Sequence, residues 1–317
     1  MNQRLRKIAV YIILTFSINF AMVAVFLAAG GKAGGTGMML LAVAYMLIPM
    51  VVTILVQKII YKQPLVKPLG ISFKVNRWFF VAWFTPPVIA FATMGVSLLF
   101  PGISYTPDMS GFMETLNQML TPEQMEASRE FIAGLPVHYI WLMLLQALIA
   151  GTTINAIFAF GEELGWRGLL LKELNFMGFW KLSALIGLIW GLWHAPLILM
   201  GHNYPQHPQL GVAVMTVWTI LLSPLFSYIR IKARSVIAAS IFHGTINAVP
   251  GLALMLISGG DDLTIGITGL AGFIVLAIIN IFLFIFDRFI ASEPVNMVLK
   301  NMDTHIEGSA DAGKPVG

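Results

Sequence analysis

Residues 139–163 read YIWLMLLQALIAGTTINAIFAFGEE, an apolar run from Tyr139 to Phe160 that ends in two adjacent glutamates. A helix needs roughly 20 apolar residues to cross the hydrocarbon of a bilayer, and this run is long enough. A charged side chain inside that hydrocarbon costs at least about 2.5 kcal/mol on insertion scales. The stretch therefore predicts a membrane-spanning helix that carries a polar site at its end.

The composition of the whole chain gives the same indication. Of its 317 residues, 58% are hydrophobic and 11% are charged, and the mean hydropathy is +0.83. Soluble domains carry about 25% charged residues, so lipid must replace water around much of the surface. The absence of cysteine excludes disulfides, thiolate metal sites and a cysteine nucleophile. A net charge of +4 is ordinary for a membrane protein and indicates no nucleic-acid partner.

Apolar stretches of spanning length recur along the chain. We therefore predict an all-α fold, a polytopic bundle of about eight transmembrane helices with membrane lipid as a partner. The predicted spans are Ile8–Ala29, Gly37–Val56, Trp78–Phe100, Tyr139–Phe160, Leu182–Met200, Val212–Ile229, Val236–Ser258 and Thr264–Phe286.

The distribution of positive charge predicts the orientation. With the N-terminus inside, all but two of the 19 Lys and Arg residues fall on the cytoplasmic side, the exceptions being Lys32 and Arg129. The basic segment Met1–Lys7 precedes an apolar run too long for a cleaved signal, so we expect an uncleaved signal anchor. We predict an integral, multi-pass protein of the cell membrane with both termini inside.

Four regions follow from this trace. Residues 1–138 are predicted to hold accessory transmembrane helices and an acidic outer loop at 101–138. Within that loop, 122–131 is typical of a short surface helix that caps the outer face. Residues 139–258 form the predicted catalytic core, 259–290 a last transmembrane helix, and 291–317 a disordered cytoplasmic tail.

Helical geometry separates the two glutamates. Neighbouring side chains differ by about 100° around a helix, whereas residues four apart lie on one face. Arg167 therefore can pair with Glu163, in the favoured order of acid before base. Glu162 points elsewhere and is predicted to have no partner in its own helix. One carboxylate is thus held as an ion, and the other is available for proton chemistry.

Histidines mark the fifth and seventh predicted spans. His194 lies about mid-span one turn after Trp190, and Pro196 beyond it should open the helix. His243 and Asn247 are four residues apart and project from one helix face. Counted from the cytoplasmic ends, these side chains can meet Glu162.

Other histidines are interpreted differently. His202 and His207 in the outer loop 201–211 are predicted to be solvated.

This set of side chains suits hydrolysis. Glu162 can take a proton from water, His194 can orient that water, and His243 with Asn247 can donate hydrogen bonds to an oxyanion. The same groups leave a zinc site open through Glu162, His194 and His243, although no His-Glu-x-x-His motif supports it. A proton-coupled transporter also uses buried Glu and His. The clustering between Glu162 and Asn247, rather than in two repeated halves, favours an active site.

Glu162-Glu163-x-x-x-Arg167, then Trp190-x-x-x-His194, then His243-x-x-x-Asn247 resembles the CPBP family over residues 140–255. That family contains the type II CAAX prenyl endopeptidases and bacteriocin-processing or self-immunity (Abi-like) proteins. Where the family motif usually has Phe, this chain has Trp190, and we expect the aromatic side chain to serve for apolar packing beside the histidine.

The resemblance implies an intramembrane endopeptidase. Glu162 and His194 would activate water, and His243 with Asn247 would form the oxyanion site. Glu163, Arg167 and Trp190 would be supporting residues. The resemblance is compatible with a metalloprotease and with a metal-free glutamate mechanism, and we favour the second, with no cofactor. Implied substrates are membrane-associated peptides or lipidated proteins. A non-catalytic self-immunity protein is the other reading that the family allows.

Overall fold

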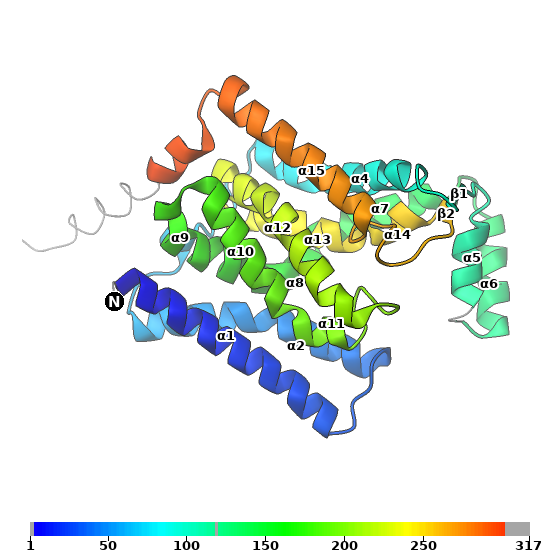
Figure 1. The fold of residues 1–317 in the computed structure, drawn as a ribbon, viewed down its shortest axis with the longest axis horizontal. Coiled ribbons are helices and arrows are strands. Elements are labelled where there is room, and N and C mark those ends of the chain that lie inside the picture. The colour runs from blue at the N-terminus through cyan, green and yellow to red at the C-terminus, as the bar shows by residue number, and fades with distance from the viewer. Residues whose placement is uncertain (1–2, 118–119, 302–317) are drawn as a thin grey trace, which may run out of the picture.

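The computed structural model describes residues 3–117 and 120–301. Its long helices lie alongside one another in a single bundle, with a helical hairpin at one end (Figure 1). The α-helices are α1 (Gln3–Ala28), α2 (Gly35–Ile54), α3 (Val66–Leu69), α4 (Arg77–Ser97), α5 (Ser110–Asn117), α6 (Pro122–Ala133), α7 (Tyr139–Thr152), α8 (Ile154–Glu163), α9 (Leu171–Leu174), α10 (Phe179–Trp193), α11 (Ala195–Leu199), α12 (Pro208–Ala233), α13 (Val236–Ala248), α14 (Pro250–Leu254) and α15 (Leu270–Ile285). The remaining helical segments are three π-helices, η1 (Leu55–Ile60), η2 (Leu164–Leu170) and η4 (Phe286–Ile290), and one 3₁₀ helix, η3 (Asn175–Met177). There are two short strands, β1 (Ser104–Tyr105) and β2 (Ile257–Ser258), in the described ranges.

The prediction of an all-α polytopic bundle is confirmed, with a lower number of full spans. Six helices in the described ranges are long and apolar enough to cross a membrane. The predicted fourth span becomes a seventh candidate if α7 and the helix that follows it, which are bent by 47°, count as one. The predicted fifth span is divided, because α10 ends at Trp193 and the short α11 follows His194. Pro196 lies in the first turn of α11, where its missing N–H does least harm.

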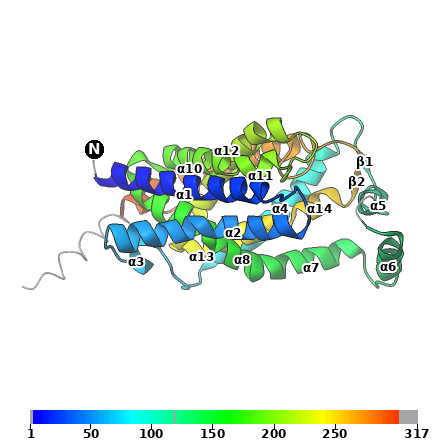
Figure 2. The same ribbon diagram turned by 90° about the horizontal axis from the view of Figure 1, so that it is seen from below.

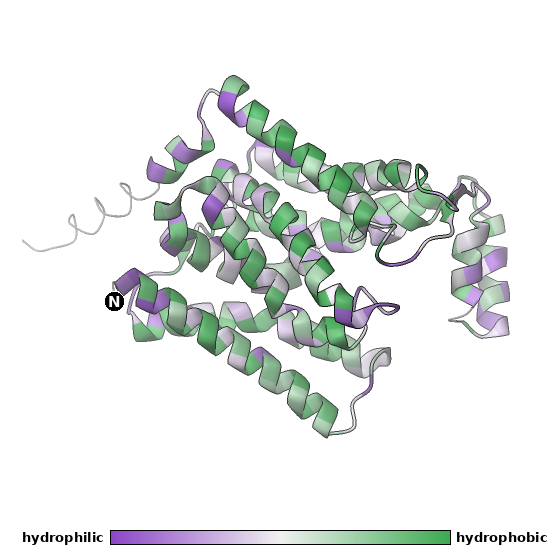
Figure 3. Cartoon of the chain, in the orientation of Figure 1, coloured by the Kyte–Doolittle hydropathy of each residue, from purple (hydrophilic) through white to green (hydrophobic). Residues whose placement is uncertain are grey.

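The two ends of the bundle differ in character. Hydrophobic residues cover most of the long helices, and hydrophilic ones gather at the start of α1 and on α6 (Figure 3). The N-terminus and α3 lie at one end, while α5, α6 and the two strands lie at the other (Figure 2).

Arg230, counted from the sequence as a cytoplasmic charge, is instead buried. Its side chain donates to the carbonyl oxygens of Arg167 at 3.1 Å and Leu69 at 3.0 Å.

The predicted outer loop is a folded cap. Helix α6 confirms the predicted surface helix, and Thr121 with Gln124 forms a reciprocal capping box at its start. The sequence offered no sign of the two short strands. Ser104 pairs with Ser258 and Tyr105 with Ile257 in an antiparallel ladder, so the cap is tied to the chain that follows α14.

The predicted disordered tail needs a correction for residues 291–301. Residues 295–301 are helical, and Val295 and Leu299 are buried. Val295 N–H donates to Asp287 at 2.9 Å, and the Asn296 side chain accepts from Phe179 N–H at 2.9 Å. The three buried apolar side chains of this segment, Val295, Val298 and Leu299, were too few to stand out in a polar stretch. The rest of the predicted tail, 302–317, lies outside the described residues.

Glycines let the core helices approach closely. A Cβ on Gly244 of α13 would lie 2.4 Å from the Gly151 carbonyl oxygen and 2.5 Å from the Ala156 nitrogen. A Cβ on Gly191 of α10 would lie 2.6 Å from the Thr216 Cα. Small residues at such crossings are typical of membrane helix bundles. Because Gly244 follows His243 directly, this contact also sets how near the histidine comes to α8.

We expect Gly244→Ala to destabilise the folded protein by about 1–3 kcal/mol, because the added methyl group overpacks a backbone contact. Thermal unfolding in detergent measures the change. Gly95→Ala in α4 is the matched control, since a Cβ there meets nothing within 4 Å and should leave the melting temperature unchanged or raise it. Equal melting of Gly244→Ala and wild type would contradict the packing argument.

Candidate active site

Glu162 lies at the end of α8 and is 2% exposed. Its Oε2 accepts the indole N–H of Trp190 at 2.7 Å and that of Trp166 at 3.3 Å. The prediction that Glu162 has no partner in its own helix was therefore wrong, because Trp166 stands four residues later on the same face. The prediction that Trp190 serves for apolar packing was incomplete, because its side chain also donates a hydrogen bond to Glu162. Its indole N–H is a donor that the usual Phe lacks.

The predicted pair of Glu163 and Arg167 is present. Arg167 Nη1 lies 3.1 Å from Glu163 Oε1, and both side chains are fully buried. The guanidinium also donates to Ser223 Oγ at 3.3 Å and lies over the ring of Phe226, 4.2 Å from its centroid. Such contacts compensate a buried cation that would otherwise be strongly unfavourable.

Glu163 also holds the first histidine of the third motif. His243 Nδ1 lies 2.8 Å from the same Glu163 Oε1. Because a carboxylate accepts, Nδ1 carries the proton and donates it. Nε2 is then the ring nitrogen available to other partners. Glu163 therefore joins α8 to α13 and orients His243, which is more than the intrahelical support predicted from spacing.

His194 occupies the break between α10 and α11. Its Nδ1 lies 2.8 Å from the carbonyl oxygen of Trp190, and a carbonyl can only accept. The proton of the neutral ring is thus on Nδ1, and Nε2 has its lone pair available. The imidazole packs edge-on against Trp193, with centroids 4.8 Å apart. The break between α10 and α11 thus places His194 where the Trp190 carbonyl and the Trp193 ring together fix the orientation of its imidazole.

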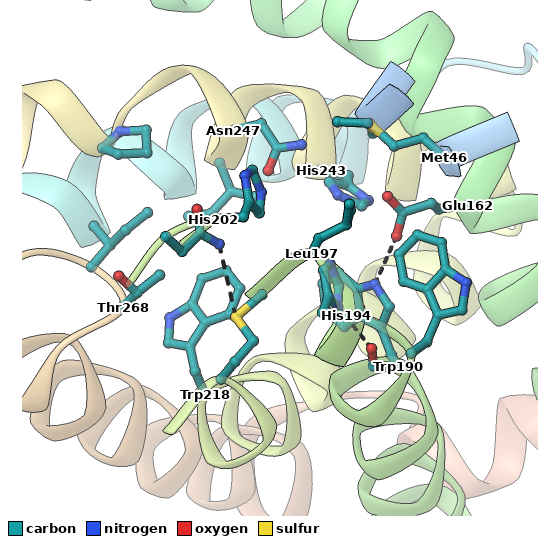
Figure 4. Close-up of a pocket in the computed structure, with 17 residues that line it drawn as sticks. Met46, Glu162, Trp190, His194, Leu197, His202, Trp218, His243, Asn247 and Thr268 are labelled. Atoms are coloured by element: carbon teal, nitrogen blue, oxygen red, sulfur yellow. Dashed lines mark hydrogen bonds between the residues drawn. The ribbon is translucent and has the colours of Figure 1, made fainter. Parts of the chain in front are cut away.

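All four predicted catalytic side chains line one cavity of about 250 Å³. Glu162, His194 and His243 lie around its deep part, and Asn247 lies beside His243 toward His202 (Figure 4). The three deep residues are buried, whereas Asn247 is exposed. The helices thus bring together side chains that are up to 85 positions apart in the sequence.

Several residues that line the cavity were not predicted from the sequence. Ala42 and Met46 of α2 line the wall, so the N-terminal half takes part in the site. His202, predicted to be solvated, lines the same cavity, and its burial lowers the pKa of the imidazole. No local pattern marks these residues, because their position follows from helix contacts and loop folding.

The loops around His202 are held in place by a second cluster. His207 Nδ1 lies 2.6 Å from Asp262 Oδ1, and Gln206 N–H donates to Asp262 Oδ2 at 2.8 Å. The Tyr204 hydroxyl donates to the Thr268 carbonyl at 2.8 Å. His207 is therefore paired rather than simply solvated. These contacts close the segments after α11 and before α15 around the cavity.

The alternative zinc site was tested against the arrangement of donors. Within residues 3–117 and 120–301, no group of three or more His, Cys, Asp or Glu side chains is arranged to hold a metal ion. We therefore derive no catalytic step through a metal.

Comparison with known proteins finds similarity to CAAX prenyl endopeptidases. A family model described as type II CAAX prenyl endopeptidase Rce1-like matches residues 136–249. The chain is also similar to CAAX prenyl protease 2 of Methanococcus maripaludis, with 35% identity over 96 residues, which are 27% of this chain and 34% of that protein. The chain thus matches about a third of the length of this curated relative.

The fold and site define a polytopic membrane protein with a buried Glu–His centre. Residues 136–249, which contain all three motifs, match the model of the Rce1-like family. The resemblance to the CPBP proteases inferred from the motifs is confirmed.

We expect Arg167→Met to destabilise the protein by about 3–5 kcal/mol, because it leaves the buried Glu163 carboxylate without its cation. Thermal unfolding in detergent measures the loss. Arg129→Met removes an exposed arginine from α6 and should change stability little. A double variant, Glu163→Gln with Arg167→Met, should be more stable than the sum of the single losses predicts. Strict additivity would show that the two groups do not interact.

Proposed function

We propose that the protein is an intramembrane endopeptidase that hydrolyses peptide bonds in membrane-associated substrates through water activated by Glu162. The observation that carries the proposal is the buried Glu162 carboxylate, held by two indole N–H groups in one cavity with His194, His243 and Asn247. The Rce1-like family of this segment supports the same activity.

The first chemical step needs a base next to a water molecule. Glu162 Oε2 is occupied by Trp190 and Trp166, and we assign Oε1 to the water. His194 Nε2 accepts the second hydrogen bond of that water, since its Nδ1 proton is donated to Trp190. Glu162 takes one proton as the water oxygen forms a bond to the scissile carbonyl carbon. The carbonyl electron pair moves to oxygen.

The oxyanion then needs donors that are already in place. The Asn247 side-chain amide is a donor in the cavity, and His243 donates from Nε2 when its ring carries two protons. Glu163 is the counter-ion for that form. Preorganised donors of this kind contribute about 3–4 kcal/mol each to transition-state stabilisation. When the intermediate collapses, the C–N bond breaks and Glu162 returns its proton to the leaving amine.

The two buried carboxylates therefore have different tasks. Glu163 is paired with Arg167 and orients His243, so we assign it a positioning role. Glu162 receives only neutral indole donors and can exchange a proton. Carboxylate pairs with separated environments are a common way to assign acid–base roles.

We expect Glu162→Gln and His194→Ala to lower peptide cleavage by at least about 100-fold, because each removes a group that handles the water proton. Comparative proteomics of membrane peptides from cells with wild-type protein and Glu162→Gln measures this loss and identifies the substrate at the same time. Glu126→Gln, an exposed position of α6 that does not line the cavity, is the control. Equal activity of the purified Glu162 and His194 variants would contradict the catalytic assignment, and solute or proton movement without cleavage would indicate a transporter. A self-immunity function that survives in Glu162→Gln would indicate a non-catalytic protein.

We expect chelation by EDTA or phenanthroline to leave cleavage unchanged, because the mechanism proposed here uses no metal. Cleavage of a substrate identified by proteomics, before and after chelation, is the measurement. Loss of activity with chelator and its return with Zn²⁺ would overturn the metal-free mechanism.

A further inference from the structure

The basic side chains of the chain collect at one end of the bundle. The segments 3–7, 58–77, 164–181, 230–235 and 288–300, named here the basic end, contain nearly all Lys and Arg residues of the described ranges. Figure 1 shows the start of α1 and α9 at this end, and Figure 2 shows the start of α1 and α3 there. Because Lys and Arg favour the cytoplasmic side, the basic end is the cytoplasmic end.

The mouth of the catalytic cavity lies at the opposite end. His202 and Asn203 follow α11, Pro250 begins α14, and Thr268 precedes α15. These four residues, named here the mouth, are partly or fully exposed, whereas Glu162 is buried. No residue of the basic end, in the described parts of the chain, lines the cavity.

An aromatic floor closes the cavity toward the basic end. Trp166 follows Glu162 by one turn and is fully buried. It packs edge-on against Tyr11, with centroids 5.8 Å apart, and against Trp193 at 5.7 Å. Tyr11 fits so closely over Gly165 that a Cβ there would lie 2.0 Å from its hydroxyl. A peptide entering from the cytoplasmic end would have to displace this layer.

Resting on the proposed peptidase function, we propose that the cavity is entered from the outer, extracytoplasmic side of the membrane. The substrate is then a peptide segment presented at that face, such as an exported peptide or the outer flank of a membrane-spanning helix. A cavity of about 250 Å³ holds only a short piece of chain, so the segment enters unwound. A tail confined to the cytoplasm cannot reach Glu162.

The absence of cysteine makes the side of the cavity directly measurable, because single-cysteine variants carry no background thiol. Thr268→Cys places a thiol at the mouth, and Lys181→Cys places one on an exposed position of the basic end. Both are labelled with a membrane-impermeant maleimide in intact spheroplasts and again after permeabilisation. We expect Thr268→Cys to reach about its full labelling in intact spheroplasts and Lys181→Cys to label at least about tenfold less. Labelling of Thr268→Cys only after permeabilisation would overturn the inference.

The substrate side is tested separately from the activity. Cleavage sites that depend on Glu162, found by comparing wild-type and Glu162→Gln cells, should map to outer-facing segments. Sites in cytoplasmic tails would overturn the inference and leave the proposed function intact. Outward labelling of Thr268→Cys with no Glu162-dependent cleavage would instead refute the proposed function and the substrate class, while the side of the cavity would stand.

Discussion

The bifurcated contact at Glu163 is the interaction on which the rest of the site depends. One carboxylate oxygen receives both the Arg167 guanidinium at 3.1 Å and the His243 Nδ1 at 2.8 Å. All three groups are buried in a part of the chain where an isolated charge would be very unfavourable. Their mutual pairing is what allows charge to exist there, and it fixes α13 against α8 at the depth of Glu162.

Close backbone contacts make this pairing possible. Gly244 lets α13 approach the break between α7 and α8, and Gly161 lets α8 approach α2, where a Cβ would lie 2.6 Å from the Met46 carbonyl oxygen. Larger side chains at these positions would separate the helices by more than the length of a hydrogen bond. The hydrogen bonds of the polar centre therefore depend on the small residues that let the helices pack closely.

Aromatic side chains surround Glu162 and His194 and make the two sides of the cavity different. Trp190 and Trp166 donate to Glu162, and Trp193 packs against His194. On the basic side, Trp166 and Trp193 form a closed layer with Tyr11, and on the other side the wall ends in polar loop residues. The proposed chemistry and the proposed side of entry thus follow from one arrangement of rings.

The sequence by itself determined the membrane class, most of the helices and the pair of Glu163 with Arg167, because apolar runs and the spacing of helical faces are local properties. It also selected Glu162, His194, His243 and Asn247, which share one cavity. Only the tertiary structure showed that Trp166 and Trp190 hold Glu162, that Glu163 holds His243 and that His202 and Met46 line the wall. Except for Trp166, whose place one turn after Glu162 was overlooked, these contacts join distant helices and loops. Their distances depend on how closely the backbones approach, which no local pattern encodes.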